Sequence, residues 1–248
     1  MIRVGLAALL IAAPAWAQEG ADIVVLGEIH DSAEAHARQA ELVEALEPSA
    51  LVFEMLSPAQ VAGAAGVDRS DAAALGGALD WDEAAWGPFD AYAPIFAAAP
   101  DAALHGAALP REALSAIVAG EEEPGGRVPP LGDDLRAVLE AEQDAAHCGM
   151  LPPELLPGMV DAQRARDRHF ADVALDAWTV NGPPVVVIAG TGHARTDVGV
   201  PAMIAFTDPQ LSVWALGQVE GEVPEDAPFD SVEVVPAVER GDPCEAFR

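Results

Sequence analysis

Two short motifs combine glycine with side chains that can do chemistry. Residues 27–30 have the sequence Gly-Glu-Ile-His, and residues 190–193 have the sequence Gly-Thr-Gly-His. Carboxylates and neutral imidazoles are ordinary ligands for zinc, manganese and iron, and a carboxylate can also be the general base that activates a water molecule. Glycine beside them lets the backbone turn sharply and lets a ligand approach closely. The two Gly-x-x-His motifs together therefore indicate a functional site.

Each motif follows a short apolar run that is typical of a buried strand. Strands are predicted over residues 22–27, 50–53 and 184–189, with further candidates at 102–105 and 211–216. In an open parallel sheet, ligands bind beyond the carboxyl ends of the strands. We therefore expect one pocket to collect the residues that follow these strands, namely Glu28, His30, Glu54, His193 and Arg195, with Arg111 after the third strand.

Helical patterns separate the predicted strands, and a capping box at Asp31 and Glu34 opens the first helix. This alternation predicts an α/β fold with a mostly parallel central sheet flanked by helices on both faces. Residues 62–90 are rich in Ala, Gly, Asp and Trp, and we expect a small helical insertion there that acts as a lid. Proline and acidic residues dominate residues 218–248, which predicts an extended tail.

Two predicted helices carry polar side chains on faces that should be buried. On the helix at 159–178, Gln163 and Arg166 share a face with apolar residues, and on the helix at 133–147, Glu142 lies within the apolar stripe. Buried charge is costly unless it is paired. These residues either form a buried ion pair, Glu142 with Arg166, or line a ligand site.

The first 17 residues have the features of a secretory signal. A basic start is followed by an apolar run at 4–13 and by the small-x-small sequence Ala-Trp-Ala at 15–17. The run is shorter than the roughly 20 residues that a membrane-spanning helix needs. We expect cleavage near Ala17, leaving residues 18–248 as a single periplasmic domain that is soluble and has no membrane span.

The charge balance excludes one class of partner. The chain has 12 Lys and Arg against 41 Asp and Glu, which gives a formal net charge of −29. Contacts to phosphate require clustered Lys and Arg, and a surface this acidic repels nucleic acid and anionic lipid. We therefore expect no nucleic-acid partner.

The chain contains two cysteines, Cys148 and Cys244. An even number of cysteines in an exported chain favours a disulfide, because the compartment beyond the inner membrane is oxidising. The bond would tie the end of the chain to its middle. The alternative is two unrelated free thiols.

Several longer segments match one known family in the same order along the chain. They are Val-Val-Leu-Gly-Glu-Ile-His-Asp (24–31), Val-Phe-Glu-Met (52–55), Trp86 with Tyr-Ala-Pro-Ile-Phe (92–96), Ala-His-Cys-Gly-Met-Leu-Pro (146–152), Ala-Gln-Arg-Ala-Arg-Asp (162–167), Ala-Gly-Thr-Gly-His-Ala-Arg (189–195) and Asp-Pro-Cys (242–244). With these segments the chain resembles the ChaN family of haem-binding proteins, part of a superfamily that includes the Tiki and TraB proteins and the erythromycin esterases. The resemblance implies a parallel sheet between two groups of helices, haem binding at the interface of a homodimer, and a role in iron uptake. Some members of the superfamily are hydrolases.

The haem-binding hypothesis assigns an iron ligand and partners for the propionates. Tyr, His, Met and Cys side chains bind haem iron, and Tyr92 is the only tyrosine in the chain and lies in an aromatic-rich stretch. We expect Tyr92 near the iron with His147 and His36 in reserve; the alternative is that Tyr92 only packs the insertion against the core. Arg166 or Arg195, with Gln163 nearby, would hold the propionates, because the planar guanidinium pairs with carboxylates through two hydrogen bonds.

A hydrolase is the second hypothesis. His30, His193, Glu28 and Glu54 would then bind a divalent metal ion or act as the base, and Arg195 would stabilise the developing oxyanion. A third hypothesis is a metal-free esterase in which His30 is the base.

Overall fold

The computed structural model describes residues 20–123, 125–242 and 244–245. The signal predicted at residues 1–17, with its cleavage site, lies outside the described residues.

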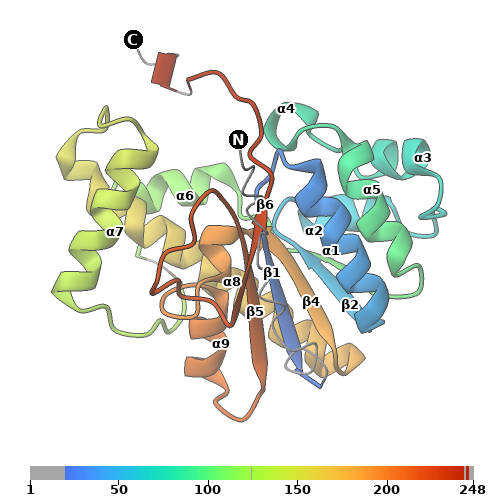
Figure 1. Ribbon diagram of the computed structural model, residues 1–248. Helices are drawn as coiled ribbons and strands as arrows, with labels where there is room; N and C mark the ends of the chain where they lie inside the picture. The colour runs from blue at the N-terminus through green and yellow to red at the C-terminus, as the bar shows by residue number, and fades with distance from the viewer. Residues whose placement is uncertain (1–19, 124, 243, 246–248) are drawn as a thin grey trace, which may run out of the picture.

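Over the described residues the chain forms one sheet of six parallel strands, which confirms the predicted α/β fold (Figure 1). The strand order is β3-β2-β4-β1-β5-β6. The strands are β1 (Ile23–Glu28), β2 (Ala50–Phe53), β3 (Ala103–Gly106), β4 (Val185–Gly190), β5 (Val213–Glu220) and β6 (Ser231–Val235).

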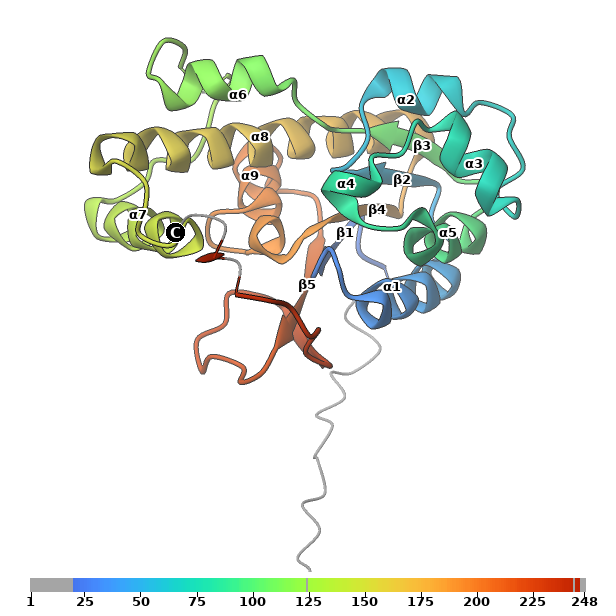
Figure 2. The same ribbon diagram turned by 90° about the horizontal axis from the view of Figure 1, so that it is seen from above.

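Helices cover both faces of the sheet. Figure 2 shows α1 to α5 on one side of the strands and α8 and α9 on the other, with α6 and α7 packed along the part of α8 that extends beyond the sheet. The helices are α1 (Ala33–Leu46), α2 (Pro58–Gly63), α3 (Ala72–Ala78), α4 (Glu83–Trp86), α5 (Phe89–Ala98), α6 (Arg111–Val118), α7 (Asp133–Ala146), α8 (Leu156–Asn181) and α9 (Val200–Thr207), with 3₁₀ turns at Pro153–Leu155 and Thr191–Ala194.

The core lies in two layers because successive residues of a strand point to opposite faces of a sheet. Val24 and Leu26 of β1 belong to the core on the α1–α5 side, whereas Ile23 and Val25 belong to the core on the α8–α9 side. All four side chains are fully buried, and each contributes about 1.5–3 kcal/mol of hydrophobic stabilisation. Burial on both faces explains why these strands are continuous apolar runs.

The start of α1 differs by one residue from the prediction. Ser32, not Asp31, caps the helix, and its side-chain oxygen accepts a hydrogen bond from the backbone amide of Ala35. Asp31 is left outside the helix, where its carboxylate is available to residues from other parts of the chain.

The segment between β2 and β3 contains the short helices α2 to α5. Ser57, Asp71 and Asp82 cap the first three of them through their side-chain oxygens. The helical insertion expected at residues 62–90 falls within this segment, which brings α4 close to the carboxyl ends of the strands (Figure 2).

The C-terminal part of the chain is more ordered than an extended tail. Beyond residue 218, β5 continues to Glu220, and β6 adds a parallel edge strand with Leu216 opposite Ser231. The prediction missed β6 because an edge strand has one exposed flank and needs few apolar residues; only Val235 of this strand is buried. The predicted disulfide between Cys148 and Cys244 is confirmed.

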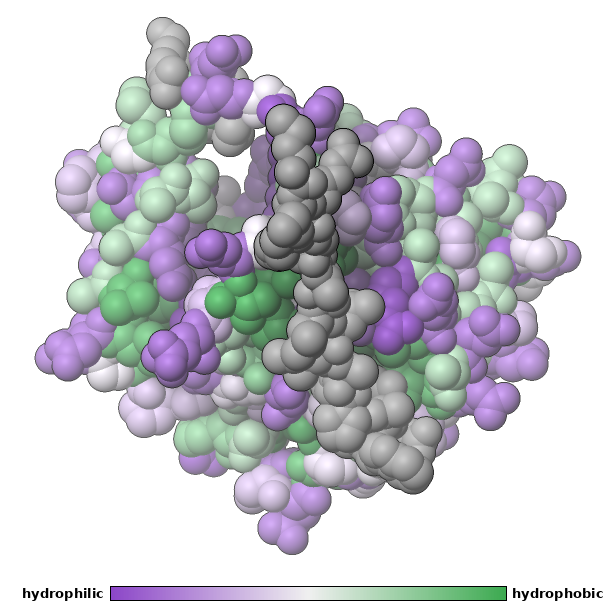
Figure 3. Space-filling model, viewed as in Figure 1, coloured by the Kyte–Doolittle hydropathy of each residue, from purple (hydrophilic) through white to green (hydrophobic). Residues whose placement is uncertain are grey.

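The surface is mostly polar. Figure 3 shows hydrophilic side chains spread over this face of the molecule, with smaller hydrophobic areas between them. Among the described helices, none combines the length and the apolar character that crossing a membrane requires.

Candidate functional site

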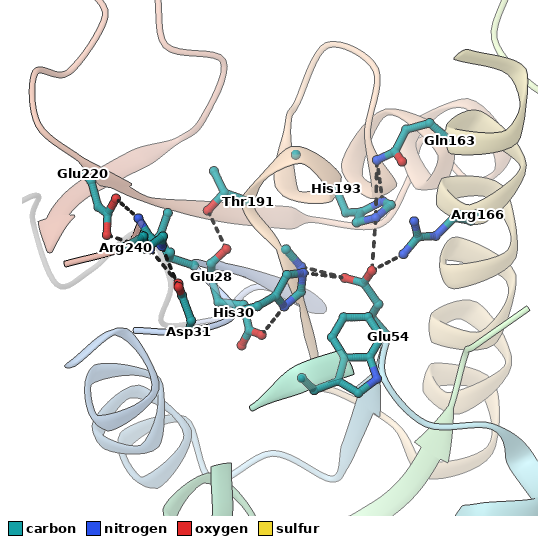
Figure 4. A pocket seen from close by; sticks show the side chains of 14 residues that line it. Glu28, His30, Asp31, Glu54, Gln163, Arg166, Thr191, His193, Glu220 and Arg240 are labelled. Carbon is teal, nitrogen blue, oxygen red and sulfur yellow. Dashed lines mark hydrogen bonds and ion pairs between the residues drawn. The ribbon is translucent and has the colours of Figure 1, made fainter. Parts of the chain in front are cut away.

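A pocket of about 640 Å³ lies beyond the carboxyl ends of the parallel strands (Figure 4). The chain leaves β1 toward β2 on one side of the sheet and leaves β4 toward β5 on the other, so the loops after β1 and β4 diverge and leave a crevice between them. The wall is formed by Glu28, Ile29, His30, Asp31, Glu54, Trp86, Gln163, Arg166, Gly190, Thr191, Gly192, His193, Glu220 and Arg240.

The glycines of the two motifs let these loops approach each other. A Cβ atom on Gly27 would lie 2.8 Å from Cβ of Ala194 and 2.9 Å from Cα of Thr191. A Cβ atom on Gly190 would lie 2.8 Å from Nε2 of His30. Each glycine therefore makes room for the loop that contains the other motif, which explains why the two motifs occur together.

Glu28 and His30 form a hydrogen-bonded pair at the end of β1. Nδ1 of His30 lies 2.8 Å from Oε1 of Glu28, and the hydroxyl of Tyr92 donates to the same oxygen at 2.6 Å. The Tyr92 hydroxyl also lies 3.2 Å from the carbonyl oxygen of His30. Tyr92 thus fixes both the carboxylate and the backbone of this turn.

Behind Glu28, the buried His36 completes the cluster. Its ring stacks on Tyr92 with centroids 3.9 Å apart, and its Nε2 lies 3.5 Å from Oε2 of Glu28. Burial raises the pKa of Glu28, but the hydrogen bond from His30 and the close approach of His36 outweigh that effect and hold the pKa below its usual value. For His30, burial lowers the pKa, and the hydrogen bond to Glu28 with the charge of Glu28 raises it above its usual value.

Glu54, directly after β2, lies at the centre of the pocket floor. Its carboxylate accepts hydrogen bonds from Arg166 and from the backbone amide of Gly190, the latter at 2.7 Å. Its oxygens lie 3.4 Å from Nε2 of His193 and 3.9 Å from Nε2 of His30. Burial raises the pKa of Glu54, but the charges of His193 and Arg166 outweigh it and hold the carboxyl well below its usual range.

His193 is buried between two carboxylates. Its Nδ1 lies 2.5 Å from Asp167 of α8, and Glu54 faces its Nε2. Burial lowers the pKa of His193, but the charges of Glu54 and Asp167 outweigh burial and raise the pKa to about 9. At neutral pH this imidazole is therefore a buried cation that offsets the two carboxylates.

The polar face of α8 points into the pocket, as one of the two alternatives predicted. Gln163 lies 3.1 Å from Nδ1 of His193, and the guanidinium of Arg166 lies 5.9 Å from the ring centre of Phe170. The other alternative was wrong, because Glu142 pairs with Arg195 and not with Arg166.

Four residues expected at the site lie elsewhere. Tyr92 is fully buried behind Glu28 and does not line the pocket. Arg195 binds Asp197 and Glu142 outside the pocket, so it is placed neither to stabilise an oxyanion nor to hold a propionate there. His147 ends α7 and hydrogen-bonds within its own helix. The exposed Arg111, expected on the same rim, is also absent from the pocket wall.

The expected metal-binding group does not form. Glu28, His30, Glu54 and His193 come together, but their nitrogen and oxygen atoms contact one another directly. Within the described part of the chain, no set of three or more His, Cys, Asp or Glu side chains could hold a metal ion.

Several residues that line the pocket or support it from behind were not predicted from the sequence. Asp167 belongs to a motif quoted above, and its spacing of four from Gln163 places both on one helical face, a signal that could have identified it. Trp86 lies on α4 and contacts the ring of His30 edge-on, with centroids 4.9 Å apart. Glu220 and Arg240 come from the region expected to be a tail, where no sequence signal indicates a site.

Replacing Tyr92 with Phe should destabilise the protein by about 1–3 kcal/mol, because the change removes a donor from a fully buried carboxylate and keeps the ring packing. The free energy of unfolding in urea measures this effect. A stability equal to that of the wild type would show that the hydroxyl does not support Glu28. The Trp81→Phe variant serves as the control. The indole nitrogen of Trp81 donates a hydrogen bond to the carbonyl oxygen of Gly87, so this change removes an aromatic donor that does not contact Glu28.

The fold and the pocket define a class: an α/β protein with a ligand pocket at the switch point of a parallel sheet. A family model described as haem-binding uptake, Tiki superfamily, ChaN, matches residues 16–204, and the chain belongs to this family. The resemblance found in the sequence is thereby confirmed. No curated protein matches the chain.

Solved structures share the fold. ChaN of Campylobacter jejuni with cofacially bound haem is 24% identical, has a TM-score of 0.70, and the match covers 86% of each chain. An erythromycin esterase, EreC, solved as a mutant in its open conformation, is 14% identical with a TM-score of 0.50, covering 93% of this chain and 80% of that one. At these identities the likeness shows the common fold.

Proposed function

We propose that this protein binds haem in the pocket, with Nε2 of His30 on the iron and Arg166 paired with a propionate. The observation that carries the proposal is the exposure of His30. Its side chain is 37% exposed on the pocket wall, whereas Glu28 holds Nδ1 on the opposite side of the ring. Among the described residues no hydrogen bond reaches Nε2, and the carboxylate of Glu54 lies 3.9 Å from it. An imidazole held through one nitrogen, with the other facing the pocket, is the usual arrangement of an iron-binding histidine.

His30 is the best ligand that the pocket wall offers. Of the side-chain types that bind haem iron, the wall includes only His30 and His193 among its described residues. The His193 side chain is 5% exposed and both of its nitrogens face carboxylates. Gly190 has no side chain, and this lets Nε2 of His30 lie against the Gly190 backbone.

Three features of the pocket support a flat ring ligand with carboxylates: its volume, the ring of Trp86 and the guanidinium of Arg166. A volume of about 640 Å³ lies within the range of about 300–1,000 Å³ that is common for pockets of drug-sized ligands. Trp86 supplies an aromatic surface beside His30. Arg166 is 29% exposed and uses one terminal nitrogen for Glu54, so its remaining donors can pair with a ligand carboxylate.

In this proposal the chain's own residues bind and orient the ligand. Bound haem would supply an iron centre with an open coordination position. Glu28 holds the proton on Nδ1 of His30, so Nε2 stays available to the iron.

The same proposal includes export to the periplasm, a role in iron uptake and a homodimer that encloses the ligand. Family membership supports these parts of it.

Titration with ferric haem tests the function. The wild-type protein should saturate and shift the Soret band from that of free haem, and Arg166→Met should weaken binding roughly tenfold, because one charge-assisted hydrogen bond is lost. Arg136→Met is the matched control, since Arg136 pairs with a single carboxylate, Asp161, away from the pocket. No spectral change with excess haem would refute the proposal.

A hydrolase without a metal ion is the second candidate, because the Glu28–His30 pair also has the form of a general base. The 2.8 Å contact would orient His30 to accept a proton from water, and Arg166 would face the developing negative charge. This candidate would be favoured if the haem-free wild-type protein hydrolyses ester substrates and the His30→Gln variant does not.

A further inference from the structure

The C-terminal segment forms part of the pocket wall. After β6, residues 236–242 place Arg240 on the pocket wall, and Figure 2 shows this part of the chain crossing from the sheet toward α7. We call residues 236–242 the C-terminal strap. At its far end Cys244 is bonded to Cys148, two residues beyond α7. The strap lies outside residues 16–204, the part of the chain that matches the family.

Arg240 fixes the strap to the rim beside His30. Its Nε and Nη2 donate to the two oxygens of Asp31, both at 2.5 Å, and Nη1 donates to Glu220 at 2.6 Å (Figure 4). The backbone amide of Val238 also donates to Glu220, at 2.8 Å. Because Asp31 follows His30 directly, the strap is held next to the proposed iron ligand.

These ionic contacts are too exposed to hold the strap alone. The side chain of Arg240 is 37% exposed and that of Asp31 is 50% exposed. Ion pairs in water each contribute little and are screened by salt. The disulfide keeps the strap close to the rim, and this raises the effective concentration of Arg240 near its two carboxylates.

We propose that the Cys148–Cys244 disulfide is a redox-controlled latch on the pocket, and that a dithiol reductant opens the strap. One thiolate of the dithiol attacks a sulfur of the disulfide and forms a mixed disulfide, which releases the other cysteine as a thiol. The second thiol of the reductant then displaces the remaining cysteine. Both cysteines end as thiols, and the reductant leaves as its cyclic disulfide after giving up two electrons and two protons.

Opening the strap removes Arg240 from the pocket wall and exposes Asp31, which widens the access to the neighbouring His30 beyond its present 37% exposure. The consequence for ligand release rests on the proposed function: haem bound at His30 should leave faster from the reduced protein. The accessibility of His30 does not depend on haem, so the latch and the proposed function can be tested separately.

The first experiment measures the rate at which diethyl pyrocarbonate modifies His30 in the ligand-free protein, by peptide mass spectrometry. Reduction with dithiothreitol should raise this rate roughly two- to fivefold. Exposed ion pairs of this kind shift an equilibrium between closed and open forms by about that factor. The Arg240→Gln variant should raise it with the disulfide intact. His105, on β3 away from the pocket, is the internal reference.

Matched variants separate the latch from a general loss of structure. Arg38→Gln removes another exposed arginine that pairs with two carboxylates, Glu41 and Glu233, and should leave the His30 rate unchanged. The double variant C148S/C244S should behave like reduced wild type; if it does not fold, reduced wild type and Arg240→Gln decide the test. The proposal would be overturned if diethyl pyrocarbonate modifies His30 at the same rate in the oxidised, reduced and Arg240→Gln proteins.

The second experiment follows transfer of haem to apomyoglobin from the oxidised and reduced protein. Reduction should raise the dissociation rate by a similar factor and reoxidation should restore it. If no haem binds but His30 becomes accessible on reduction, the proposed function fails and the latch remains. If haem binds but neither rate responds to reduction, the latch fails and the proposed function remains.

Discussion

Replacing His30 with Gln should lower the affinity for haem by more than about a hundredfold and abolish the shifted Soret band. Loss of residues that only orient a metal ligand typically lowers affinity by about 10- to 100-fold, and loss of the ligand itself should exceed that range. Glutamine keeps a polar side chain of similar length on the pocket wall, so the pocket should retain its shape. The measurement is a spectrophotometric haem titration of both proteins.

Two variants serve as controls for this prediction. His147→Gln removes a histidine that is outside the pocket, and Tyr92→Phe removes the hydroxyl that is buried behind Glu28; both should retain the Soret shift. A shift that persists in His30→Gln but disappears in Tyr92→Phe would return the iron ligand to Tyr92 and would require that side chain to leave the core. A shift lost only in His147→Gln would place the haem outside this pocket.

Replacing His193 with Ala should destabilise the protein by about 3–5 kcal/mol, the usual effect of removing one partner of a buried ion pair. Without the imidazolium, Asp167 and Glu54 remain as two buried carboxylates, with Arg166 as the nearest cation. His193→Gln should be less damaging, because an amide can still donate a hydrogen bond to a carboxylate. Urea unfolding at pH 7 measures both.

The pH dependence of stability provides a second measurement for His193. Its pKa rises from 6.5 in the unfolded chain to about 9 in the folded protein, so folding favours the protonated form. The stabilisation, about 3 kcal/mol, is fully present below pH 6.5 and is lost as the pH rises through 9. The wild type should therefore lose stability between pH 6.5 and 9, and His193→Ala should show a much smaller loss, which comes from His30, whose pKa folding also raises.

A histidine on α8, the helix that carries Asp167, serves as the control for the pH dependence. His169 of α8 is partly buried, and burial lowers its pKa, so His169→Ala should retain the alkaline loss of stability seen in the wild type. A wild-type stability that is constant from pH 6.5 to 9 would show that His193 is not held as a cation.

The strands of the central sheet were predictable from the sequence. β1, β2 and β4 are buried on both faces and therefore appear as continuous apolar runs with clear ends. β6 was not predictable, because an exposed edge strand needs little apolar character. The disulfide was predictable because the chain contains only two cysteines.

The residues of the candidate site that directly follow a strand were predictable from the sequence. Parallel strands end at the same edge of the sheet, and β2, β4 and β1 are neighbours in it, so Glu54, His193 and Glu28 lie close together. Arg195 shows the limit of this rule: two residues beyond His193 the chain has turned away, and the guanidinium meets Glu142 and Asp197 instead.

The sequence by itself determined the parallel sheet, the edge at which the two Gly-x-x-His motifs meet, and the disulfide. Only the tertiary structure decided that Tyr92 supports Glu28 from inside the core, that Asp167 and Glu54 surround His193, and that Arg240 closes the rim. The physical reason is that periodicity and spacing report which face of an element is buried, whereas the partner of a buried charge depends on how separate elements pack.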